Sequence, residues 1–130
     1  MIVLDAAAAV ELLLGSQVGR HVADRLDSGA ELHYPELLPI EAVSAVRGLV
    51  RAGVMSVDRG QRAVEHLADL GGARHRHGML VVPVYRLASR FSVYDAVYLA
   101  LAQVLGARLL TTDGRLARQA TSLIDVELVA

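Results

Sequence analysis

Short apolar or aromatic runs alternate along this chain with segments whose apolar residues recur at helical spacing. The short runs predict strands at 2–4, 31–34, 80–84, 107–112 and 126–129. The longer segments predict helices at 6–14, 18–26, 38–52, 57–70, 95–105 and 115–120, with a helical turn near 85–90. Glycines at 15 and 53 mark two of the expected helix ends.

This alternation of strands and helices is typical of an α/β fold in which parallel strands are covered by helices. We therefore expect a parallel sheet of about five strands flanked by helices on both faces. Pro83 places the run 80–84 at a strand end or a sheet edge, because proline cannot donate a ladder hydrogen bond. The chain shows no repeat or linker, so 1–130 is expected to form one domain.

The segment 95–105 is the most informative part of the sequence. After Asp95 it contains no charged residue, and Gln103 is its only strongly polar side chain. A helix that is apolar nearly all round is expected to be buried, so Asp95 is brought to the edge of the core. An anion there needs a compensating partner, and the helix carries no Lys or Arg. The alternative is that Asp95 is simply the N-cap of this helix.

Three other acids have comparable positions. Asp5 and Asp113 each follow a predicted strand directly, at the edge where open α/β sheets bind ligands. Glu41 is expected in the first turn of its helix, near the small side chain of Ser44. Each acid alone could be a helix cap or a solvated first-turn residue. Together they would repel one another unless a cation were bound, and hard oxygen ligands suit Mg²⁺ or Mn²⁺.

Composition narrows the possible chemistry. The chain has no Cys, which excludes disulfides and thiolate sites, and its thirteen basic residues are all Arg, which excludes a catalytic lysine. A net charge of −1 provides no strong overall field for nucleic acid. The hydrophobic content of 54% and mean hydropathy of +0.41 suggest an apolar surface for a partner. We expect no signal peptide and no membrane span, and a cytoplasmic location.

The sequence resembles the PIN-domain ribonucleases, and most closely the VapC-type toxins of toxin–antitoxin modules. The matching stretches are 2–6, 37–46 around Glu41, 94–102 around Asp95, and 110–113. The resemblance assigns Asp5, Glu41, Asp95 and Asp113 to the acidic catalytic set, and Thr111 to the hydroxyl residue before the last acid. The chain departs from the family pattern at Ala7, where Ser is frequent, and at Ser44, where Asn is frequent.

The resemblance implies a metal-dependent endoribonuclease that hydrolyses RNA with a metal-activated water. Asp5 and Asp95 would bind Mg²⁺ or Mn²⁺ directly, and Asp113 directly or through water. Glu41 would act through a water or accept a proton, and Thr111 and Ser44 would support the ligands. The implied partners are RNA, a VapB-type antitoxin and a second copy of the chain, in a homodimer or in a heterotetramer or larger complex with the antitoxin.

Arginine and histidine residues outside the acidic set give weaker indications of function. Basic residues that could contact RNA lie in the predicted loop 73–78 and around the expected site, namely Arg74, Arg76, Arg86, Arg90 and Arg115. His75 and His77 could form a metal pair, but the carboxylates explain a metal site better. The alternatives to a nuclease are a catalytically inactive binding module on the same fold and a phospho-acceptor receiver domain. The receiver requires a lysine that the chain lacks.

Overall fold

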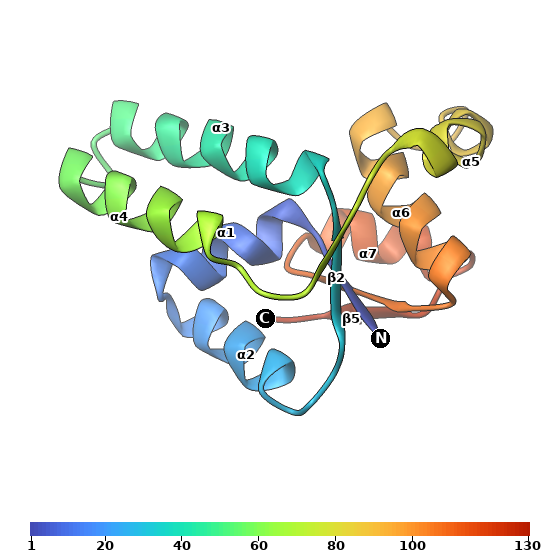
Figure 1. The fold of residues 1–130 in the computed structure, drawn as a ribbon, viewed down its shortest axis with the longest axis horizontal. Coiled ribbons are helices and arrows are strands. Elements are labelled where there is room, and N and C mark those ends of the chain that lie inside the picture. The colour runs from blue at the N-terminus through green and yellow to red at the C-terminus, as the bar shows by residue number, and fades with distance from the viewer.

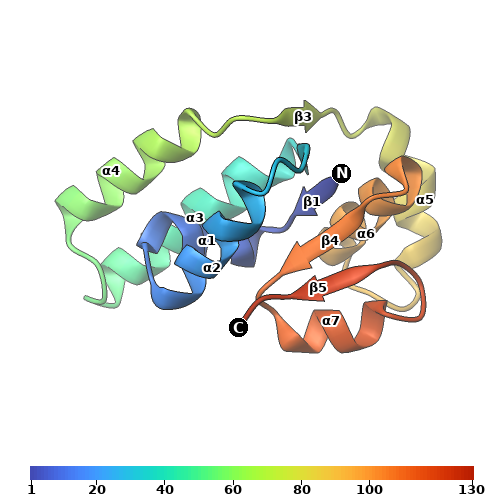
Figure 2. The same cartoon turned by 90° about the horizontal axis from the view of Figure 1, so that it is seen from below.

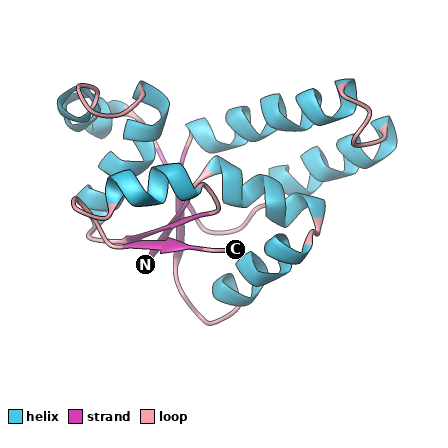
Figure 3. Ribbon diagram, turned by 180° about the vertical axis from the view of Figure 1, so that it is seen from behind, coloured by secondary structure: helices cyan, strands magenta, loops and turns pink.

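Five parallel strands form one sheet in the order β3-β2-β1-β4-β5. The computed structural model describes residues 1–130, and Figures 1 and 3 show the sheet surrounded by helices. The strands are β1 (Ile2–Leu4), β2 (Leu32–Pro35), β3 (Ala73–His75), β4 (Arg108–Thr111) and β5 (Val126–Leu128). The helices are α1 (Ala6–Leu14), α2 (Gln17–Leu26), α3 (Leu37–Arg51), α4 (Val57–Ala68), the 3₁₀ turn η1 (Gly78–Leu80), α5 (Val81–Leu87), α6 (Val93–Leu105) and α7 (Gly114–Ala120).

The core lies on both faces of the central strands. In β1, Ile2, Val3 and Leu4 are all buried, although consecutive side chains of a strand point to opposite faces. Helix α6 packs across β1, β2 and β4, and its residues from Ala96 to Ala102 are all buried. The expected single α/β domain with a parallel sheet covered on both faces is confirmed, and 95–105 is the buried helix that its composition predicted.

The parallel arrangement brings the carboxyl ends of all strands to one edge of the sheet. The sheet is twisted, so β3 and β4 run in different directions in Figure 2 although every neighbouring pair is parallel. Asp5 follows β1 and Asp113 follows β4, and these two strands are hydrogen-bonded neighbours. The fold therefore places both carboxylates at the same edge.

The strand predicted at 80–84 is wrong, because this segment is helical. Leu80 ends η1, and α5 begins at Val81 and replaces the turn expected near 85–90. Pro83 lies in the first turn of α5, where a backbone N–H has no partner within the helix, so proline is tolerated. Val81 and Val82 are exposed, so this run is apolar without being part of the sheet. A short apolar run does not distinguish a strand from a helix by periodicity.

The third strand, β3, lies instead in the segment predicted as a basic loop. It pairs with β2 at the edge of the sheet, and its residues Ala73 and Arg74 are exposed. Gly72 permits this approach, because its φ is 98° and a Cβ there would lie 2.6 Å from the carbonyl oxygen of Leu32.

None of the helices combines the length and the apolar composition that a membrane span requires.

The histidines of this segment do not form the metal pair considered from the sequence. Nε2 of His75 lies 2.9 Å from Nδ1 of His33 on the neighbouring strand, and burial lowers the pKa of His75. The backbone N–H of Leu37 donates to Nε2 of His77 at 3.0 Å. His77 therefore satisfies an N–H group at the start of α3, where no side chain of the helix provides a cap.

Candidate active site

Asp5 is the most buried of the four acids, with 4% of its surface exposed. It is the N-cap of α1, since the N–H of Ala8 donates to its Oδ1 at 2.8 Å. The hydroxyl of Thr111, at the end of β4, donates to the other oxygen. Burial raises the pKa of Asp5 to about 6, although both hydrogen bonds oppose the rise, and the charges of Asp113 and Asp95 add to it.

Asp113 is held by the helix that follows it. Its Oδ1 accepts hydrogen bonds from the N–H groups of Arg115 (2.9 Å) and Leu116 (3.1 Å), so it is the N-cap of α7. The N–H of Asp113 itself donates to Oγ1 of Thr111 at 3.0 Å. Thr111 thus joins Asp5 to Asp113 through its hydroxyl group. The cap interpretation is correct for both acids, and it coexists with their convergence at one edge.

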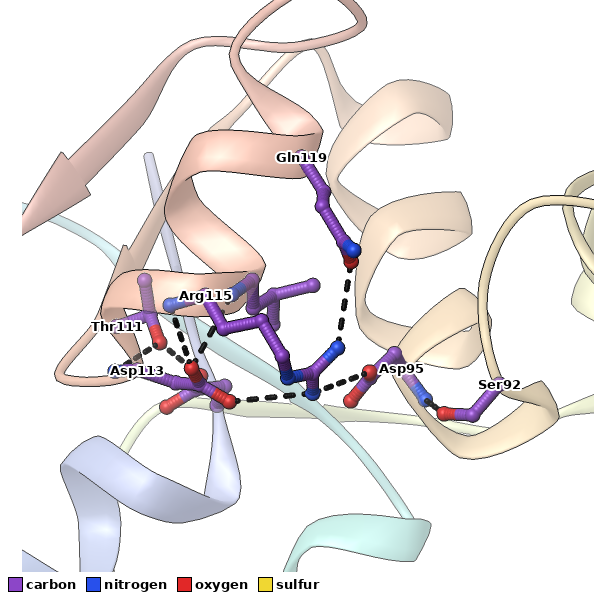
Figure 4. Close-up of polar contacts among 8 residues, drawn as sticks. Ser92, Asp95, Thr111, Asp113, Arg115 and Gln119 are labelled. Carbon is purple, nitrogen blue, oxygen red and sulfur yellow. Dashed lines mark hydrogen bonds and ion pairs between the residues drawn. The ribbon is translucent and has the colours of Figure 1, made fainter.

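Asp95 is not a cap, contrary to the alternative considered from the sequence. The N-cap of α6 is Ser92, whose Oγ accepts from the N–H of Asp95 at 3.1 Å, and Asp95 is the third residue of the helix (Figure 4). Its carboxylate is free of capping and lies toward α7, with 23% of the side chain exposed. The motif Ser92-x-x-Asp95 is a capping signature, and it is the signal that could have identified Ser92.

Glu41 lies in the second turn of α3 rather than the first, because the helix begins at Leu37. Its Oε1 is buried and has no hydrogen-bond partner, and the hydroxyl of Tyr98 on α6 has none either. Burial raises the pKa of Glu41; the nearby Tyr98 lowers it and Asp95 raises it. Burial, followed by the Glu41 charge, raises the pKa of Tyr98. The two groups are therefore neighbours with unused polar atoms.

Glu41 lines a groove between α3 and α6. The groove has a volume of 460 Å³, and its lining is Leu37, Ile40, Glu41, Ser44, Ala45 and Tyr94. Ser44 therefore lies beside Glu41, where the sequence placed it. Tyr94 is 63% exposed at the rim, whereas Tyr98 is buried in the core. Of the four acids, Glu41 alone lines this groove.

Arg115 is the one candidate RNA-binding arginine that touches the acids. Its Nη2 lies 3.3 Å from Oδ2 of Asp95 and 3.4 Å from Oδ2 of Asp113 (Figure 4). Its Nη1 donates to Oε1 of Gln119 at 3.2 Å, and the sequence did not single out Gln119. The other candidates form no ion pair in the structure and are exposed, namely Arg74, Arg76, Arg86 and Arg90; the last lies 5.6 Å from the centre of the Phe91 ring.

The donor set fits a hard divalent cation, although the side chains are not arranged as a finished metal site. No three His, Asp or Glu side chains form a group that could hold a metal as they stand. The acids are nevertheless close enough for their charges to interact. Asp95 and Asp113 raise the pKa of Asp5, and Asp95 raises the pKa of Glu41. All available donors are oxygens, and Oε1 of Glu41 is buried without a partner. Such donors suit Mg²⁺ or Mn²⁺.

Comparison with known proteins gives relatives that match the whole chain. The sequence is 39% identical to ribonuclease VapC12 of Mycobacterium tuberculosis over 130 residues, which is 100% of both chains. The fold is similar to PAE2754 from Pyrobaculum aerophilum, with a TM-score of 0.72, 22% identity, and 95% and 82% of the two chains covered. It is also similar to M. tuberculosis VapC20, a sarcin–ricin loop cleaving toxin, with a TM-score of 0.70, 15% identity, and 91% and 94% covered. No protein-family model matches the sequence.

Proposed function

This chain belongs to the VapC family of ribonucleases, and from that premise we propose that it is the endoribonuclease toxin of a toxin–antitoxin module. The observation that carries the proposal is the 39% identity to ribonuclease VapC12 over the full length of both chains. The gathering of Asp5, Asp95, Asp113 and Glu41 at one sheet edge supports it, because acidic side chains of this kind hold the cation of metal-dependent phosphodiester hydrolases.

We propose Asp5, Asp95 and Asp113 as the residues that hold Mg²⁺ or Mn²⁺, with Glu41 acting through a water or as a proton acceptor. When bound, the cation would lower the pKa of a water and stabilise charge on the leaving oxygen. Thr111 orients Asp5 and Asp113 through its hydrogen bonds to both. Deprotonated Asp5 is the form that binds a cation, so its raised pKa makes metal affinity pH-dependent.

The groove between α3 and α6 is the proposed path of the RNA strand. Glu41 and Ser44 lie along its wall, and Tyr94 at its rim offers an exposed aromatic face for a base. Attack by water would leave a 5′-phosphate and a 3′-hydroxyl on the products. The identity of the RNA depends on the shape of this groove and of the loops around it.

A cleavage assay tests the proposal. Purified protein is expected to cut RNA in Mg²⁺ or Mn²⁺ and to stop in EDTA, and Asp95→Asn is expected to remove most of the activity while the protein stays folded. Undiminished cleavage in EDTA, or products that end in a cyclic phosphate, would contradict the mechanism. A catalytically inactive binding module on this fold predicts instead that metal makes no difference.

The partners proposed for the toxin are a VapB-type antitoxin and a second copy of the chain, in the cytoplasm. A surface on η1 and α5 is unusually apolar for a free face, with Met79 54%, Val81 63%, Val82 59% and Tyr85 83% exposed. A homodimer that covers this face should bury more than ~1,000 Å² in total. An antitoxin that inserts an arginine among the acids would compete with the metal for their oxygens.

A further inference from the structure

Arg115 occupies the space between two of the proposed metal ligands. Its guanidinium bridges Oδ2 of Asp95 on α6 and Oδ2 of Asp113, the N-cap of α7. The oxygens that Arg115 engages are the ones left free by helix capping, since Asp113 uses Oδ1 for the cap of α7 and Asp95 caps nothing. A divalent cation that binds these two oxygens would therefore compete with the guanidinium, because both are positively charged and both would lie against the same oxygens.

The backbone of Arg115 is fixed by a hydrogen bond, whereas its guanidinium makes only weak contacts. The N–H of Arg115 donates to the Asp113 cap, so its backbone is fixed in the first turn of α7. The side chain is 58% exposed, and its ion pairs of 3.3 and 3.4 Å are long for charge-assisted hydrogen bonds. Exposed pairs of this kind contribute little, so they can be exchanged for a stronger partner.

Gln119 binds the guanidinium through a further hydrogen bond that does not involve the acids. Its Oε1 accepts from Nη1 of Arg115, one helical turn along α7. Figure 4 shows that this contact involves neither carboxylate, so it does not depend on the two ion pairs. A planar guanidinium at that rim matches the geometry of a phosphate group.

We propose that Arg115 is an internal counter-ion of the site, which bridges Asp95 and Asp113 when no metal is bound and moves to the RNA phosphate when a metal takes the two carboxylates. Gln119 is the positioning residue for this movement. The inference rests on the proposed function of the site. Arg115 would therefore weaken metal binding and strengthen RNA binding, so one side chain would have two opposite effects.

The test compares Arg115→Gln with Arg118→Gln, which removes the same charge from the same helix but from a side chain with no ion pair in the structure. Mn²⁺ binding is measured by calorimetry without RNA, and cleavage kinetics are measured at saturating Mn²⁺. Arg115→Gln should tighten Mn²⁺ binding roughly three- to tenfold, because it removes two weak competing pairs. It should also lower kcat/KM at saturating Mn²⁺ by about tenfold or more, because it removes a phosphate contact.

Equal Mn²⁺ affinity in the two variants, or unchanged kcat/KM for Arg115→Gln at saturating Mn²⁺, would overturn the proposal. Arg115→Lys gives a second test that keeps the charge but loses the planar fork, and it should bind Mn²⁺ more tightly than the unsubstituted protein with reduced cleavage. If the unsubstituted protein binds Mn²⁺ but cuts no RNA, or cuts RNA without any metal, the proposed function fails, and that outcome is distinct from a failure of Arg115.

Discussion

Replacing Asp5 with Asn should stabilise the metal-free protein at neutral and alkaline pH. The carboxylate of Asp5 is buried, and its pKa rises from an ordinary value of 3.8 to about 6. Because the folded-state pKa is raised, the acid contributes most to stability below its unfolded pKa, and that stability is lost as the pH rises from about 4 to about 6. A rise of about two units corresponds to about 3 kcal/mol at pH 8.

Asn keeps most of what Asp5 does for the fold. It is as good an N-cap as Asp, so the hydrogen bond from the Ala8 N–H to the side-chain oxygen remains, and its amide can donate to Thr111. Asn carries no charge to bury beside Asp95 and Asp113. We therefore expect Asp5→Asn to raise the free energy of unfolding by about 1–3 kcal/mol at pH 8 in EDTA, and to have little effect near pH 4.

Urea unfolding of the two proteins between pH 4 and pH 8, in EDTA, measures this difference. Asp24→Asn is the matched control, because Asp24 is exposed on α2 and forms no ion pair, and it should show no such trend. Added Mg²⁺ should reverse the order, since only the unsubstituted protein gains binding free energy from the cation. The reasoning is refuted if Asp5→Asn is less stable than the unsubstituted protein at pH 8 in EDTA, or if the difference does not shrink toward pH 4.

Three further substitutions address other parts of the molecule. Glu41→Gln should lower kcat by roughly 10²–10⁴-fold in a cleavage assay, if Glu41 accepts a proton, while its buried and unpartnered oxygen predicts no loss of stability in urea unfolding. His77→Ala should destabilise the protein by about 1–2 kcal/mol in urea, because the N–H of Leu37 loses its acceptor, and calorimetric Mn²⁺ affinity should not change. Tyr85→Asp should give a monomer by sedimentation, if the η1 and α5 face joins two copies, without destabilising the monomer, because the side chain is 83% exposed.

The features that the sequence predicted correctly are those determined by burial or by the direction of the strands. The segment 95–105 could be assigned to a buried helix because almost no polar side chain interrupts it, and the structure buries it against three strands. Asp5 and Asp113 could be placed at one edge because parallel strands end on the same side. These inferences use the average environment of a segment and do not depend on particular contacts.

The errors concern segments whose structure depends on a neighbour rather than on their own composition. β3 is polar, and it is a strand because its backbone pairs with β2, which no pattern of side chains in 73–75 reveals. The run 80–84 resembles a strand, but it pairs with no strand of the sheet, and it forms the end of η1 and the start of α5 with exposed valines. The position of Arg115 between two acids likewise could not be predicted, because Arg115 lies on α7 and Asp95 on α6, and only the tertiary fold brings these two side chains together.

The two acids that follow strands use their two oxygens differently, and this division couples the fold to the site. In Asp5 and Asp113, Oδ1 accepts the N–H groups at the start of a helix, while Oδ2 faces Thr111 in one and Arg115 in the other. The N–H groups at a helix start favour a negative charge, so each cap offsets part of the repulsion that gathering the acids creates. Loss of activity after substitution by Ala is therefore ambiguous at both positions, because it removes a cap and a proposed ligand together. Substitution by Asn keeps the cap and removes only the charge, so the difference between Asn and Ala variants separates what each acid does for the fold from what it does for the reaction.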